Sequence, residues 1–86
     1  MEKISQMHIL KKVRFPMAAI FDSPEDYLGQ IVVRIFDVEK QPQMATDYVA
    51  VYEDLESARK DMKKAGFFCA VKRDEKDEKS LVETWI

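Results

Sequence analysis

The chain of 86 residues has few of the side chains that build catalytic and metal sites. It contains one cysteine and one histidine, Cys69 and His8, which lie far apart in the sequence. A structural zinc site needs four such ligands, so we expect no metal, and a single thiol excludes an intramolecular disulfide. A lone cysteine is typical of a reducing compartment. We therefore expect a cytoplasmic protein in which Cys69 faces the core.

Long apolar runs are also missing. No segment approaches the roughly 18 consecutive apolar residues that a membrane-spanning helix needs. Residues 1–15 carry charges on both sides of a short apolar patch, which is not the pattern of a signal peptide. The sequence therefore predicts no membrane partner.

Glycine is scarce as well, and this excludes several kinds of binding loop. Gly29 and Gly66 are the only two glycines, too few for a phosphate-cradling loop or a dinucleotide-binding fingerprint. The carboxylates Asp22, Glu25 and Asp26 cluster, but a solvated turn accounts for them. We expect no catalytic residues, no cofactor and no enzymatic activity.

The composition is that of one globular domain, residues 1–86, with 47% hydrophobic and 35% charged residues. The net charge is −2 and the pI is about 5.4, which disfavours a nucleic-acid partner. Charge is unevenly spread: residues 1–15 carry +3, residues 16–56 carry −7 and residues 57–86 carry +2. An acidic middle between basic ends favours a protein partner or a second copy of the chain in a homodimer.

Alternating and β-branched segments predict a sheet. Residues 30–38 are the clearest strand, because they are rich in valine and isoleucine. Residues 24–28 fit either a very short helix or a wide hairpin connection, and residues 39–46 and 74–80 are polar loops. The predicted strands are 7–15, 17–22, 30–38, 47–52, 67–73 and 81–86, the last pairing with 67–73 as a hairpin. Residues 81–86 also fit a helix, because their apolar residues can lie on one helical face.

One helix is predicted over residues 54–65. Asp54 is a good N-cap, Gly66 is placed to end the helix, and apolar residues recur between them at offsets 0, 3, 7 and 10. The fold class that follows is α+β: a small mixed β-sheet of about five strands with this one main helix packed on one face. A ferredoxin-like βαββαβ order with a degenerate first helix is the alternative.

Alternation of side chains divides each predicted strand into a helix-facing and an outer set. Because Arg34 marks the outer face, we expect Ile31, Val33 and Ile35 to enter the core, together with Val49 and Val51. An aromatic outer face would be covered by the N-terminal segment, by a second copy or by a partner. The predicted interaction face consists of Val32, Arg34, Phe36, Tyr48, Tyr52, Phe68 and Lys72.

These features predict a small non-enzymatic interaction or regulatory protein that acts through protein–protein contacts. Two alternatives remain open. Aromatic residues beside cations on a sheet resemble a base-stacking platform, which suits a single-stranded RNA-binding module. A ferredoxin-like fold would suit a small-molecule sensor or an enzyme.

Overall fold

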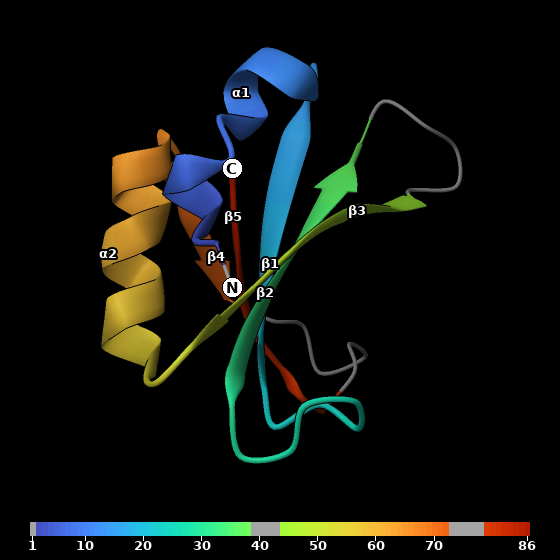
Figure 1. The fold of residues 1–86 in the computed structure, drawn as a ribbon, viewed down its shortest axis with the longest axis vertical. Helices are drawn as coiled ribbons and strands as arrows, with labels where there is room; N and C mark the ends of the chain where they lie inside the picture. The colour runs from blue at the N-terminus through green and yellow to red at the C-terminus, as the bar shows by residue number, and fades with distance from the viewer. Residues whose placement is uncertain (1, 39–43, 73–78) are drawn as a thin grey trace.

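A computed structural model describes residues 2–38, 44–72 and 79–86, which form two layers, one of helices and one of strands (Figure 1). The predicted loops at 39–46 and 74–80 fall largely outside the described residues. In chain order the elements are the 3-10 turn η1 (Ile4–Gln6), α1 (Ile9–Lys12), β1 (Pro16–Asp22), β2 (Ile31–Asp37), β3 (Met44–Tyr52), α2 (Leu55–Ala65), β4 (Ala70–Lys72) and β5 (Leu81–Trp85).

The five strands form one sheet in the order β3-β2-β1-β5-β4, and every neighbouring pair is antiparallel. The prediction of about five strands and one main helix is confirmed. The predicted sheet was mixed because the strands before and after the helix were expected to pair in parallel. In the structure these strands are β3 and β4, which lie at opposite edges of the sheet and do not pair. β3 and β4 share a direction, but β2, β1 and β5 lie between them. The ferredoxin-like order is wrong, since three strands follow one another before α2.

The main helix begins and ends where its caps predict. The Asp54 carboxylate accepts a hydrogen bond from the Ser57 backbone N–H, at 2.7 Å. Gly66 has φ +108°, the left-handed conformation that glycine adopts with little strain, and its N–H bonds to the Lys63 carbonyl. Ala58 and Met62 are fully buried, so this stripe attaches α2 to the sheet.

The N-terminal segment is helical, and the strand predicted at 7–15 is wrong. Ile9 and Val13 are four residues apart and both buried, which is the spacing of one helical face. Ile4 is fully buried where η1 packs against α2. In Figure 1, η1 and α2 lie on the same side of the strands, so this segment belongs to the helical layer and does not cover the second sheet face.

The connection between β1 and β2 is a wide hairpin, which was one of the two predictions for residues 24–28. Residues 24–28 form turns and bends without a helix. Gly29 has φ +77°, and its N–H donates to the Ser23 hydroxyl at 3.1 Å. Pro24 is buried, so part of this loop folds back onto the protein.

Candidate functional site

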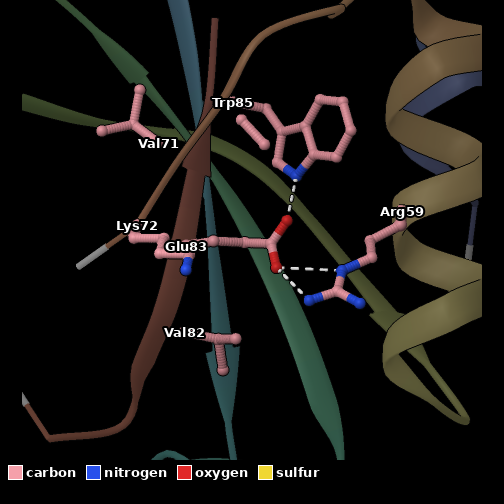
Figure 2. Close-up of a pocket in the computed structure, with 7 residues that line it drawn as sticks. Arg59, Val71, Lys72, Val82, Glu83 and Trp85 are labelled. Atoms are coloured by element: carbon pink, nitrogen blue, oxygen red, sulfur yellow. Dashed lines mark hydrogen bonds and ion pairs between the residues drawn. The ribbon is translucent and has the colours of Figure 1, made fainter.

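A hollow of about 550 Å³ lies on the helical side of the sheet, between α2 and the edge formed by β4 and β5 (Figure 2). α2 lies over the other half of this face, where it packs on β2 and β3. The hollow lies over the half formed by β4 and β5. The hollow is lined by Arg59, Ala70, Val71, Lys72, Val82, Glu83 and Trp85.

A buried carboxylate lies at the centre of this hollow. Glu83 is 6% exposed, and both of its oxygens have partners. Oε1 accepts hydrogen bonds from Arg59 Nε at 2.9 Å and Nη2 at 2.7 Å, and Oε2 accepts one from the Trp85 indole N–H at 2.7 Å. Figure 2 shows the Arg59 side chain reaching from α2 to this carboxylate. A buried charge with partners on both oxygens is stable in the folded state.

The hollow is cationic overall. Arg59 and Lys72 contribute two positive charges and Glu83 one negative charge. The hydrogen bonds to Glu83 raise the pKa of the Arg59 guanidinium, which is therefore charged at any physiological pH. A guanidinium has five N–H donors, and the bonds to Glu83 use two of them. The Arg59 side chain is 50% exposed, so the remaining donors can reach a ligand.

β4 is an edge strand whose outer side pairs with no other strand among the described residues. Cys69 and Ile86 exchange both backbone hydrogen bonds, which makes them a hydrogen-bonded pair. Bonded and non-bonded pairs alternate in an antiparallel ladder. The backbone groups of Ala70 and Lys72 therefore point away from β5, toward the open edge, and all three residues of β4 are exposed.

Apolar side chains are exposed around the same edge. Phe68 is 88% exposed, Ile86 52% and Val71 48%. The Phe68 N–H donates to the Ile86 carbonyl, so the backbones of these two residues are neighbours. Figure 2 shows Val71 on the side of β4 opposite to Glu83 and Trp85. Apolar surface thus surrounds a strand edge whose outward backbone donors and acceptors bond to no other strand in the described part of the chain.

The structure separates the seven residues of the predicted interaction face. Val32, Arg34 and Phe36 do share the sheet face that lies away from α2, because their neighbours Ile31, Val33 and Ile35 belong to the core. Lys72 lies on the helical side, since its Cα partner is the buried Glu83. Phe68 is exposed but precedes β4, so it is not part of the sheet face.

The two tyrosines lie on the opposite face from the one predicted. Tyr52 is the Cα partner of Ile31, is 4% exposed and donates its hydroxyl proton to Asp61 on α2. Tyr48 packs against the core. Val49 and Val51 are the Cα partners of Arg34 and Val32 and therefore face outward, so their predicted place in the core is wrong.

The outer face carries a second hollow, of about 380 Å³, under the β1–β2 loop. Phe21, Arg34 and Phe36 line it from the sheet, and the Arg34 guanidinium forms an ion pair with Asp26 of the loop. The predicted cluster at Asp22, Glu25 and Asp26 therefore includes one carboxylate that binds the sheet. The pair neutralises the charge of Arg34 on this face.

A second buried carboxylate fastens the N-terminal segment to α2. Asp61 is 6% exposed and accepts hydrogen bonds from the Tyr52 hydroxyl, the Ser5 hydroxyl and the Ser5 backbone N–H. The Ile4 N–H donates in turn to the Tyr52 hydroxyl oxygen, at 3.2 Å. Burial alone raises the pKa of Asp61, but the hydrogen bonds from Ser5 and Tyr52 outweigh it and the pKa is lowered.

Stability is expected to depend on pH through Asp61. Its pKa is lower in the folded than in the unfolded chain, where it is about 3.9. The ionised form therefore stabilises the fold above about pH 4, and this contribution is lost as the pH falls through the folded-state pKa. We expect the difference in unfolding free energy between the wild type and Asp61→Asn to shrink from pH 7 to pH 3 in urea titrations. A constant difference would contradict this assignment.

Three further expectations concern chemistry and location. Cys69 is exposed, so its predicted place in the core is wrong: β4 begins at Ala70, and Ala70 and Lys72 are the residues that pair with the buried Trp85 and Glu83 on the helical side. In the described ranges, no group of three or more histidine, cysteine, aspartate or glutamate side chains is arranged to hold a metal ion. None of the helices described is both long and apolar enough to cross a membrane.

The hollow between α2 and β4 was not predicted, although one local pattern pointed to it. Glu83 and Trp85 are two residues apart in a predicted strand, so they share a face. A charged residue beside the only tryptophan on a core-facing strand indicates a buried hydrogen-bonded pair. Arg59 is 24 residues away, and nothing local assigns it to Glu83.

Comparison with protein-family models, with curated proteins and with solved structures finds no match to this chain.

Proposed function

We propose that this chain is a small non-enzymatic interaction or regulatory protein of the cytosol that acts through protein–protein contacts. The observation that supports this proposal is the apolar surface at the β4 edge. Of the five large hydrophobic side chains that are exposed in the described residues, three lie there: Phe68, Val71 and Ile86. Apolar side chains that cluster on the surface mark interaction sites.

The state of the buried carboxylates supports a role without catalysis. A general acid or base must reach a proton of the substrate. The oxygens of Glu83 are occupied by Arg59 and Trp85, and those of Asp61 by Ser5 and Tyr52. Both carboxylates thus connect structural elements. The exposed Cys69 thiol is compatible with the reducing conditions of the cytosol.

A small-molecule sensor is the second candidate, because the hollow beside α2 lies within the roughly 300–1,000 Å³ range of ligand pockets. A metabolite that binds there raises the melting temperature by mass action. The RNA-binding alternative loses its main support, since Tyr48 and Tyr52 lie on the helical side of the sheet.

The proposal is tested by removing the apolar surface. In the variant Phe68→Ser/Val71→Ser we expect retention of the protein's partners in quantitative affinity purification to fall at least about tenfold, the loss of about 1.4 kcal/mol of binding free energy. Leu28→Ser is the matched control, because Leu28 is 76% exposed on the β1–β2 loop, away from β4. Equal retention by the double variant and the wild type would contradict the proposal.

The partner in this experiment can be a second copy of the chain, and light scattering identifies that case. A solution mass near twice the 10.1 kDa of the chain, which falls to one chain mass in the double variant, would assign the surface to self-association. Circular dichroism of both variants should match the wild type, since the substituted side chains are exposed.

A further inference from the structure

We propose that β4 binds an extended, acidic segment of a partner protein as a sixth strand, with Arg59 and Lys72 holding a carboxylate of that segment in the hollow beside α2. This inference rests on the proposed function and names its partner by chemistry. Strand addition to an open edge is a general mode of peptide recognition, in which backbone hydrogen bonds give affinity and side-chain pockets give specificity.

The backbone of β4 is arranged for such a strand. Ala70 and Lys72 direct their N–H and C=O groups to the open edge, while Val71 bonds inward to β5. No proline lies in β4, and no bulge interrupts its pairing with β5. Within residues 44–72 and 79–86, the features that usually protect an edge strand are limited to the short length of β4 and to Lys72.

The hollow has two levels along β4, and each favours a different side chain. At one level Lys72 is the Cα partner of Glu83, which binds Arg59, so this level carries two cations. At the other level Ala70 is the Cα partner of Trp85, so this level is apolar. A strand places every second side chain on one face. An added strand therefore directs two side chains, two residues apart, into these two levels.

The direction of the added strand fixes the order of the two side chains. All described strand pairs in this sheet are antiparallel, and we infer an antiparallel sixth strand. Such a strand meets the level of Lys72 before the level of Ala70. The segment then reads Asp or Glu, any residue, and an aliphatic residue, in N-to-C order.

Charge distinguishes this partner from a second copy of the chain. Pairing two β4 edges antiparallel would bring the lysine and the arginine of both copies to one seam, and like charges at an interface are unfavourable. An acidic side chain instead meets Lys72 and the free donors of Arg59, and it leaves the bonds to Glu83 in place.

The experiment uses a random library of seven-residue peptides displayed on phage, selected on the full-length protein. We expect the enriched peptides to share an acidic residue followed two positions later by valine, isoleucine or leucine. The best one is synthesised with its acidic residue as glutamate, together with a matched peptide that has glutamine there. Trp85 is the only tryptophan and lies at the hollow, so its emission reports binding of both peptides.

Two pairs of variants test the backbone and the charge separately. Ala70→Pro removes an edge-facing N–H and spares the bonds to β5, and we expect it to weaken binding at least about tenfold relative to Ala70→Ser, which keeps the N–H. Lys72→Gln should reduce the preference for glutamate over glutamine. Lys11→Gln removes an exposed charge from α1, outside the residues that line the hollow, and should leave this preference unchanged.

The proposal is overturned if no sequence is enriched, if the enriched peptides have no acidic position, or if Ala70→Pro, shown to be folded by circular dichroism, binds as Ala70→Ser does. The proposed function survives these results if Phe68→Ser/Val71→Ser still loses its partner. The partner would then use the apolar surface without adding a strand. If the acidic peptide binds but the double variant keeps every partner, the strand site stands and the apolar surface is not the site.

Discussion

Replacing Asp61 by alanine is expected to lower the free energy of unfolding by about 2–4 kcal/mol at neutral pH. The substitution removes the common acceptor of Ser5 and Tyr52, and it leaves the tyrosine hydroxyl buried without its acceptor. A domain of this size has a total stability of roughly 4–13 kcal/mol, so the loss is a large fraction of it. Urea denaturation followed by circular dichroism measures the effect.

A double-mutant cycle assigns the loss to the network. Tyr52→Phe removes the hydroxyl alone, and its cost should not add to that of Asp61→Ala, because both changes break the same hydrogen bond. Glu56→Ala is the matched control: it removes an exposed carboxylate from the same helix and should change stability by less than about 0.5 kcal/mol. Full additivity in the cycle would show that Asp61 stabilises the fold by another route.

The same network explains why the N-terminal segment could not be predicted. Ile9 and Val13 have a helical spacing, but the alternating polar and apolar residues of 7–15 also fit a strand. The choice is made by Ile4 and Ser5, which bond to Tyr52 and Asp61 about 50 residues later in the chain. Contacts of such sequence separation leave no local pattern. The choice between helix and strand for residues 7–15 therefore depended on distant residues of the same chain, which local sequence patterns do not identify.

Local chemistry was sufficient for α2 and for most of the sheet. The Asp54 cap, the apolar stripe and Gly66 act within a few residues, and they predicted the helix to within one residue at its start. β1, β2 and β5 follow from β-branched and alternating segments. Such features are decided by neighbours in the chain.

The orientation of β3 was predicted wrongly for a different reason. Alternation separates Tyr48, Ala50 and Tyr52 from Val49 and Val51, but it does not say which set is buried. Valines normally face the core. Here the tyrosines face the core. The Tyr52 hydroxyl donates a hydrogen bond to Asp61 and accepts one from the Ile4 N–H, and these bonds offset the free-energy cost of burying the hydroxyl. The predicted aromatic interaction face depended on this choice, and the candidate site at β4 became visible only with the fold.

Replacing Trp85 by alanine is expected to cost about 3–5 kcal/mol, the range for truncating a large buried aromatic side chain. Trp85 is the Cα partner of Ala18 in β1 and of Ala70 in β4, so its ring fills the space beside two small residues and closes the base of the hollow. Trp85→Phe keeps most of the ring but removes the N–H that donates to Glu83.

The comparison of the two variants separates packing from hydrogen bonding. Trp85→Phe should cost about 1–3 kcal/mol, because a buried carboxylate oxygen loses its donor while Arg59 continues to compensate the charge. Urea denaturation followed by circular dichroism suits both, since neither retains tryptophan emission. A cost below about 0.5 kcal/mol for Trp85→Phe would show that Arg59 alone holds Glu83.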